Sequence, residues 1–272
     1  MKFRLNVLLA CSLTFFISTI STVQADDSTV VIRGSHALYL TLETHIKEIN
    51  KAANVKVDFS KPGGCGDAVK NVTTGRGVGA VCCHLDDAEL ARMGGAMLYP
   101  LALEPLMITI NKKNRVRDLT AFQVRMIMSG QIKNWQEVGG ADQKIVVVMR
   151  PHCGPRPGHW KTILPTSQWK PHIKVNKFLT MITTVDKLPG AIGHLGSVLY
   201  DPKMMNVVMI NGVNPLDPTV FDKGYPFFRP ISLALPANPT DGEMRVANYL
   251  GSAAAKDFFT NKHIVQSKRF AP

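Results

Sequence analysis

Short apolar strands alternate with amphipathic helices up to about residue 164, and this order constrains the fold more than any other feature of the sequence. β-branched or alternating apolar residues predict strands at 28–32, 55–59, 77–81 and 145–149. A helical pattern follows each of these strands. Because such an order is typical of α/β folds, in which parallel strands are the default, the sequence predicts an open α/β sheet.

Chemically versatile side chains gather where the predicted strands give way to helices. In an open α/β sheet, ligands bind beyond the carboxyl ends of the strands, next to helix N-termini whose free N–H groups favour negative charge. We therefore expect a binding site at these junctions. They carry Ser35, Cys65, Cys82, Cys83, His84, Arg150, His152 and Cys153.

Residues 1–25 have the pattern of a cleavable secretory signal: positive charges, then an apolar run, then a small-residue site ending at Ala25. The alternatives are a membrane anchor, which polar residues within the run disfavour, and lipid attachment at Cys11, which too short an apolar leader disfavours. We expect a periplasmic protein that begins near Asp26. Four cysteines then remain in an exported chain, so disulfides are permitted.

The charge balance favours an anionic partner. The chain has 32 Lys and Arg against 20 Asp and Glu, a formal net charge of +12, and loss of Lys2 and Arg4 with the leader lowers this to +10. Export and the absence of a basic-aromatic motif disfavour nucleic acid. No hydrolase triad, zinc-protease motif or phosphate-cradling glycine loop is present in the sequence, so we predict a protein that is not an enzyme.

Several motifs together resemble the phosphate-binding periplasmic proteins of ABC transporters. The segment from Ser129 to Gly140, with Ser-Gly-Gln-Ile-Lys-Asn-Trp followed by Val-Gly-Gly, is the most specific of them. The others are Gly34-Ser35, Gly63-Gly64-Cys65-Gly66, Asn111 to Leu119, Arg150 to Arg156 and Pro189 to Gly193. The resemblance runs from about Val30 to the C-terminus.

The resemblance implies a two-lobed α/β fold of the type II periplasmic binding class, hinged around a ligand cleft. Lobe one would comprise residues 26–107 with 200–272, and lobe two residues 108–199. The apolar run from Leu98 to Ile110 would be a core strand near the hinge. A small inorganic ion would be the ligand of a monomeric receptor that serves a membrane permease or a sensor kinase.

Carried over position by position, the resemblance makes Ser35 a hydroxyl ligand and Arg150 the guanidinium ligand of an oxyanion. The sequence also departs from the family pattern, because cysteines stand where ligand-facing serines are expected. These departures are Cys65-Gly66, Cys82-Cys83-His84 and His152-Cys153-Gly154, together with His194 in place of the usual tyrosine.

Thiols are weaker hydrogen-bond donors than hydroxyls, but thiolates bind soft metals and metalloids. Our leading hypothesis is therefore a cleft adapted to a thiophilic ion such as arsenite or a soft metal. Its candidate ligands are Cys65, Cys82, Cys83, His84, His152, Cys153 and His194, and Ser35, Gly66, Arg150 and Gly154 would hold any oxygens.

Four alternatives stay open. The first is an ordinary receptor for phosphate or arsenate, and the second is a redox protein with a metal or iron–sulfur cluster on this scaffold. The third is disulfide pairing, either of Cys65 with Cys153 or of Cys82 with Cys83. In the fourth, the cysteines pack as small apolar residues.

Overall fold

The computed structural model describes residues 29–60, 62–83, 85, 87–151, 160–164 and 168–267. The predicted leader lies outside these residues, as do His84, His152, Cys153 and Gly154. Of the helices in the described part of the chain, none has both the length and the apolar composition needed to cross a lipid bilayer.

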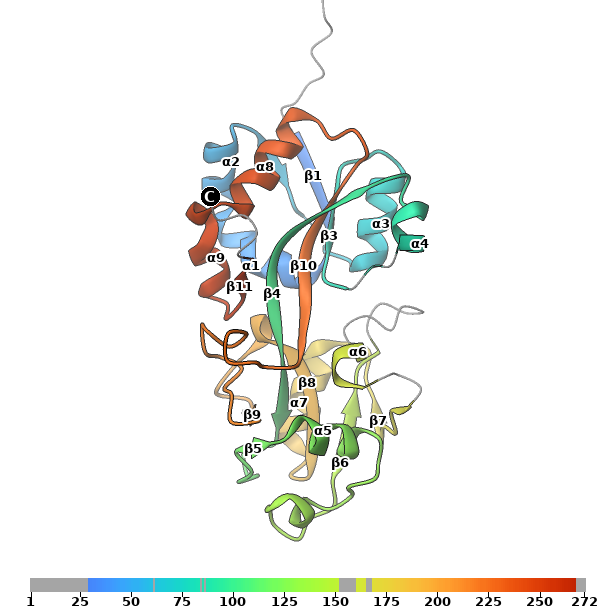
Figure 1. The fold of residues 1–272 in the computed structure, drawn as a ribbon, viewed down its shortest axis with the longest axis vertical. Helices are drawn as coiled ribbons and strands as arrows, with labels where there is room; N and C mark the ends of the chain where they lie inside the picture. The colour runs from blue at the N-terminus through green and yellow to red at the C-terminus, as the bar shows by residue number, and fades with distance from the viewer. Residues whose placement is uncertain are drawn as a thin grey trace, which may run out of the picture.

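Two lobes, each with its own hydrophobic core, are joined by two long strands that run side by side between them (Figure 1). These strands are β4 (Met97–Ile110) and β10 (Phe228–Leu235). The first core contains residues from Val30 to Ala102 and from Ile231 to Ile264. The two-lobed α/β fold predicted from the resemblance is confirmed.

The first lobe contains the N-terminal α/β units and the C-terminal helices. Its elements, besides β10, are β1 (Thr29–Gly34), α1 (His36–Leu42), η1 (Glu43–His45), α2 (Ile46–Ala53), β2 (Lys56–Asp58), α3 (Cys65–Thr73), β3 (Val78–Val81), α4 (Asp87–Arg92), α8 (Asp241–Gly251), η5 (Ala253–Ala255), α9 (Lys256–Thr260) and β11 (Val265–Gln266). The helical pattern expected after the strand at 28–32 corresponds to α1, which buries Leu38 and Leu42 and is continued after one tight turn by α2.

The second lobe has its sheet covered on both faces, by α5 on one side and α7 on the other. Its elements are β5 (Asp118–Leu119), α5 (Ala121–Met128), η2 (Trp135–Val138), β6 (Val146–Met149), α6 (Trp160–Ile163), β7 (Ile173–Lys174), α7 (Phe178–Lys187), β8 (Ala191–Gly196), η4 (Ser197–Leu199) and β9 (Asn206–Ile210).

The main run of strands has the order β2-β1-β3-β10-β4-β8-β6-β7. Within each lobe the predicted parallel pairing is found, between β1 and its neighbours β2 and β3 and between β6 and its neighbours β7 and β8. The expected parallel pairing is not found for the two strands that run between the lobes. There β10 is antiparallel to β3 and β4, and β4 is antiparallel to β8. The reason is that the chain enters the second lobe along β4 and leaves it along β10.

The second crossing lies about thirty residues later than the expected boundary after residue 199. Residues Met205 to Phe227 contribute to the cores of the second lobe, not to the first. The cause is strand pairing, because β9 pairs with the end of β4 through Val208 and Ile108 and also with β5. The expected assignment of 200–227 to lobe one is thus at odds with the packing.

Candidate functional site

A cavity of about 300 Å³ lies between the lobes. The lining residues of the first lobe are His36, Ala37 and Leu40 of α1, the segment Gly63 to Gly66, and Cys82. Those of the second lobe are Arg150, Phe178, Val198 and Leu199. Arg229 of the crossing strand β10 completes the lining. The rings of His36 and Phe178 meet across it with centroids 5.9 Å apart. Both lobes therefore contribute side chains to one small chamber.

Three cysteines gather at the floor of this cavity on the side of the first lobe, where Cys65 and Cys82 line it and Cys83 contacts Cys65. Cys65 is the first residue of α3, and Cys82 and Cys83 directly follow β3. The Cys65 Sγ lies 3.7 Å from the Cys82 Sγ and 3.3 Å from the Cys83 Sγ. All three sulfurs lie within 4.8 Å of one another, and each residue is at most 3% exposed.

All three cysteines are free thiols in the structure. Their sulfur separations far exceed a disulfide bond of about 2.05 Å. The alternative of a vicinal disulfide between Cys82 and Cys83 is therefore not found in the structure, while the alternative pairing of Cys65 with Cys153 involves a residue outside the described ones. We call this cluster of Cys65, Cys82 and Cys83 the thiol floor.

Close backbone packing brings the thiol floor together. Gly34 at the end of β1 has a φ of +131°, and a Cβ there would collide with the Ala80 carbonyl of β3. The same carbonyl region anchors the next residue, because the Ser35 N–H donates to the Ala80 oxygen at 2.9 Å. The start of α3 is held against β1, because the N–H groups of Gly63 and Gly64 both donate to the Gly34 carbonyl. The first residue of α3 thus meets the end of β3.

The N-terminus of α3 carries no side-chain cap. Its N-cap, Gly64, has a φ of +117°, a conformation that glycine tolerates best. The first N–H groups of a helix have no partner within that helix. The N–H groups of Cys65 and Gly66 are such groups, and both residues line the cavity. They form an anion-attracting wall next to the thiol floor.

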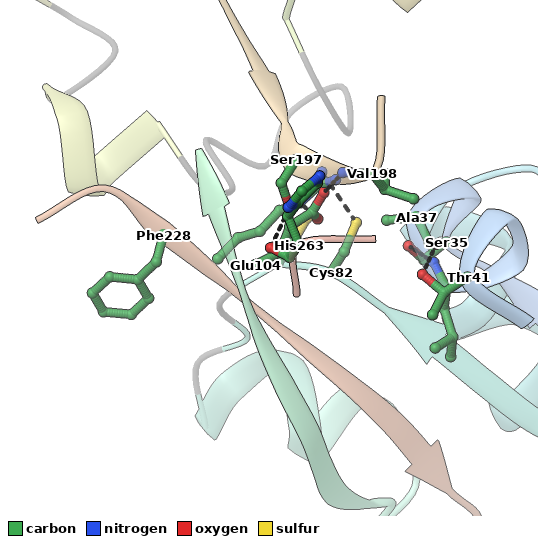
Figure 2. A network of polar contacts seen from close by, with 12 residues as sticks. Ser35, Ala37, Thr41, Cys82, Glu104, Ser197, Val198, Phe228 and His263 are labelled. Carbon is green, nitrogen blue, oxygen red and sulfur yellow. Dashed lines mark hydrogen bonds and ion pairs between the residues drawn. The ribbon is translucent and has the colours of Figure 1, made fainter. Parts of the chain in front are cut away.

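A buried ion pair adjoins the thiol floor. Arg229 Nε donates to Glu104 Oε2 at 2.5 Å, and the exposed fractions of the two residues are 5% and 0%. The other carboxylate oxygen of Glu104 accepts the Val198 N–H at 3.2 Å. Arg229 Nη1 also donates to the Cys82 Sγ at 3.7 Å, so the pair connects both crossing strands to the floor (Figure 2).

Opposing effects act on the pKa of Arg229. Burial alone lowers it, but the charge and hydrogen bond of Glu104, with smaller contributions from the neighbouring Cys82 and Cys83, outweigh burial and raise the pKa above its ordinary value. The guanidinium therefore stays charged, and the carboxylate of Glu104 balances that charge. Gly196 must lack a side chain here, because a Cβ would collide with both members of the pair.

Arg150 lies where the sequence places it, one residue beyond β6 and in the cavity lining. Its Nε donates to the Asn176 carbonyl at 3.2 Å. Cys65, Gly66 and Cys82 also line the cavity, and Cys83 lies directly behind them.

Ser35 and His194 are placed differently from the other predicted site residues. Ser35 is fully buried as the N-cap of α1, and its Oγ accepts the Leu38 N–H at 3.4 Å. Figure 2 shows Ser35 beside Thr41, apart from the group around Glu104. Neither Ser35 nor His194 is among the residues that line the cavity. Their roles as ligands stay predictions.

His194 lies in the fully buried strand β8 of the second lobe, where its ring packs edge-on against Trp169 at 5.6 Å. Among the described residues, only the three cysteines form a group of at least three His, Cys, Asp or Glu whose potential ligand atoms lie within 4.8 Å of one another. His194 is therefore not brought together with them, because its strand position opposite Ile108 places it in the sheet of lobe two.

Sequence reasoning missed four residues of the site. His36 and Phe178 face each other across the cavity, and Glu104 and Arg229 form the ion pair. The sequence does contain a signal for Glu104 and Arg229. Glu104 is the single charged residue inside the apolar run of β4, and Arg229 follows two phenylalanines. Charged residues within buried strands are rarely left unpaired.

The family model of a PBP superfamily domain matches residues 19–259. The phosphate-binding protein PstS of Bacillus subtilis is 29% identical over 205 residues, which is 73% of this chain and 67% of that protein.

Two solved structures are similar across the whole fold. A putative phosphate ABC transporter substrate-binding protein with bound phosphate from Clostridium perfringens has a TM-score of 0.76 at 23% identity, covering 89% of this chain and all of that one. An ABC-type phosphate transport receptor from Vibrio cholerae has a TM-score of 0.69 at 23% identity, with coverage of 88% and 100%. The chain therefore belongs to the PBP superfamily, as a member similar to phosphate-binding proteins and with the type II periplasmic binding fold.

Proposed function

We propose that the protein is a periplasmic receptor that closes its lobes around a small inorganic oxyanion of the phosphate or arsenate class. It would act as a monomer and deliver the ion to a membrane permease, or present its closed form to a sensor kinase. The observation that carries this proposal is the cavity itself, because Arg150 of lobe two and the uncapped start of α3 in lobe one line the same chamber.

The two walls of the cavity complement an oxyanion. The N–H groups of Cys65 and Gly66 and the dipole of α3 favour negative charge. Arg150 offers a planar fork of donors that fits a tetrahedral oxyanion. Arg229 contributes less, because Glu104 already balances its charge at 2.5 Å. Several similar proteins are named as phosphate-binding, which supports the same ligand class.

A second candidate is a receptor for a thiophilic ion or metalloid, such as arsenite or a soft metal. The observation that favours it is the thiol floor, whose sulfurs all lie within 4.8 Å of one another. The alternative of an iron–sulfur redox protein has less support, because such clusters are usually held by four cysteine ligands and the floor offers three.

Equilibrium binding of phosphate and arsenate to the exported, purified protein tests the first candidate. We expect Arg150→Gln to weaken oxyanion binding about 10- to 100-fold, because a hydrogen bond to a charged group contributes about 1.5–3 kcal/mol. Arg76→Gln is the matched control, since Arg76 is exposed beyond the far end of α3. The proposal fails if the wild type binds neither ion, or if Arg150→Gln binds them as Arg76→Gln does.

A further inference from the structure

We propose that the thiol floor is a three-coordinate site for trivalent arsenic or antimony, which it takes up as the neutral hydroxide. This inference rests on the second candidate function, the receptor for a thiophilic ion, and specifies its ligand and its binding residues. It shares only the cavity with the first candidate function, the oxyanion receptor. Cys65, Cys82 and Cys83 would supply one thiolate each.

The sulfur separations fit one small central atom. An ion bound to two thiolates at about 2.3 Å, with an angle between about 90° and 110°, holds the sulfurs about 3.3 to 3.8 Å apart. The observed separations from the Cys65 Sγ are 3.3 Å to the Cys83 Sγ and 3.7 Å to the Cys82 Sγ. Two of the three sulfur separations therefore match those around a single bound atom, and the third, between Cys82 and Cys83, is within 4.8 Å.

The charges around the floor favour a trivalent occupant. Three thiolates carry three negative charges, and the nearby ion pair adds none, because Arg229 and Glu104 cancel. A monovalent or divalent metal would leave net negative charge among residues that are at most 5% exposed. Uncompensated buried charge is strongly unfavourable, whereas a trivalent atom leaves the site neutral.

The binding step balances without a further reactant. Arsenous acid, As(OH)₃, meets three thiols, three S–H and three As–O bonds break, and three As–S bonds form. Each hydroxide leaves with one thiol proton as water. Arsenic stays trivalent, no electron is transferred and no proton is released to solvent.

A neutral solute can reach the floor through the cavity between the lobes, because Cys65 and Cys82 line it directly and Cys83 lies behind them. Two acidic groups lie near this path. The carboxylate of Asp67 in α3 lies close to Gly63, and Glu104 is paired with Arg229. His36 of α1 and Arg150 after β6 also line the cavity.

Binding of arsenite to the reduced protein under anaerobic conditions tests the inference. Native mass spectrometry should show one adduct equal to an arsenic atom less three hydrogens. Because arsenous acid brings its own hydroxides, the affinity should stay nearly constant between about pH 6 and pH 8, whereas Zn²⁺ must displace thiol protons and should bind more tightly as the pH rises. An adduct that loses fewer than three hydrogens, or an arsenite affinity that rises with pH as that of Zn²⁺ does, would overturn the proposal.

Single variants identify the ligands. Cys82→Ser and Cys83→Ser should each weaken arsenite binding at least about 100-fold, the upper end of the loss seen when a residue merely supporting a metal ligand is changed. A loss of the same size in Cys153→Ser would contradict a site made by the floor alone. Circular dichroism shows whether each variant is folded.

A parallel phosphate titration separates the two proposals. Phosphate binding without the arsenic adduct overturns this inference and leaves the proposed function standing. The adduct without any oxyanion binding supports the inference and removes the first candidate function.

Discussion

On the first lobe, the cleft is lined by thiols and by the start of a helix, whereas the second lobe lines it with a guanidinium, an aromatic ring and aliphatic side chains. Cys65 and Cys82 can hold a soft atom, and the N–H groups of Cys65 and Gly66 can hold oxygen. Arg150 from the opposite lobe suits oxygen alone.

This difference implies that an oxyanion contacts both lobes, whereas a metalloid contacts mainly the first. An oxyanion needs both walls, because its oxygens must reach Arg150 as well as the start of α3. A metalloid bound by three thiolates is held by the first lobe alone, since all three cysteines belong to it. Oxyanion binding should therefore depend on lobe closure more than arsenite binding does.

The largest expected effect concerns the ion pair at the crossing strands. We expect Glu104→Ala to lower the free energy of unfolding by about 3–5 kcal/mol, because it leaves the buried guanidinium of Arg229 without its counter-charge. Urea denaturation followed by circular dichroism measures the change.

The exposed pair of Asp217 and Lys223 provides the matched control. Solvent screens this pair, so Asp217→Asn should change stability much less than Glu104→Ala. An equal loss of unfolding free energy in the two variants would contradict the claim that the buried ion pair stabilises the fold more than the exposed pair does. Replacing Glu104 and Arg229 together by leucine should restore most of the loss, because no unpaired charge then remains.

A smaller effect separates the two ligand classes directly. Cys65→Ser should strengthen phosphate binding about 2- to 10-fold, since a hydroxyl is a better donor than a thiol and one hydrogen bond contributes about 0.5–1.5 kcal/mol. The same variant should weaken arsenite binding. Calorimetric titration of both ions checks the opposite signs, and a change in the same direction for both ions would remove the distinction between the two walls.

Local patterns predicted most of the elements that carry the site. The strand ends and helix starts around Cys65, Cys82 and Arg150 lie where hydrophobic periodicity places them, because these elements are set by short-range pattern and glycine turns. Trp135 of the Asn-Trp motif is buried in the core of the second lobe, and its Nε1 donates to the Gly190 carbonyl at 3.0 Å.

The same local sequence patterns could not predict contacts between residues far apart in the chain. Glu104 and Arg229 are 125 positions apart and meet only because β4 and β10 cross the lobes together. The late lobe boundary has a similar origin, since β9 stays in lobe two by pairing with β4. Ser35 illustrates a local ambiguity, because a serine at a helix start serves equally as a cap or as a ligand.

Competition between phosphate and arsenite in one sample tests the central claim, that one cleft offers two chemistries. Bound radiolabelled phosphate is measured by equilibrium dialysis while arsenite is added. We expect arsenite to displace phosphate, because Cys65 both lines the oxyanion cavity and belongs to the thiol floor. Phosphate that stays bound at saturating arsenite would contradict a shared site, and so would a protein that retains no phosphate at the start.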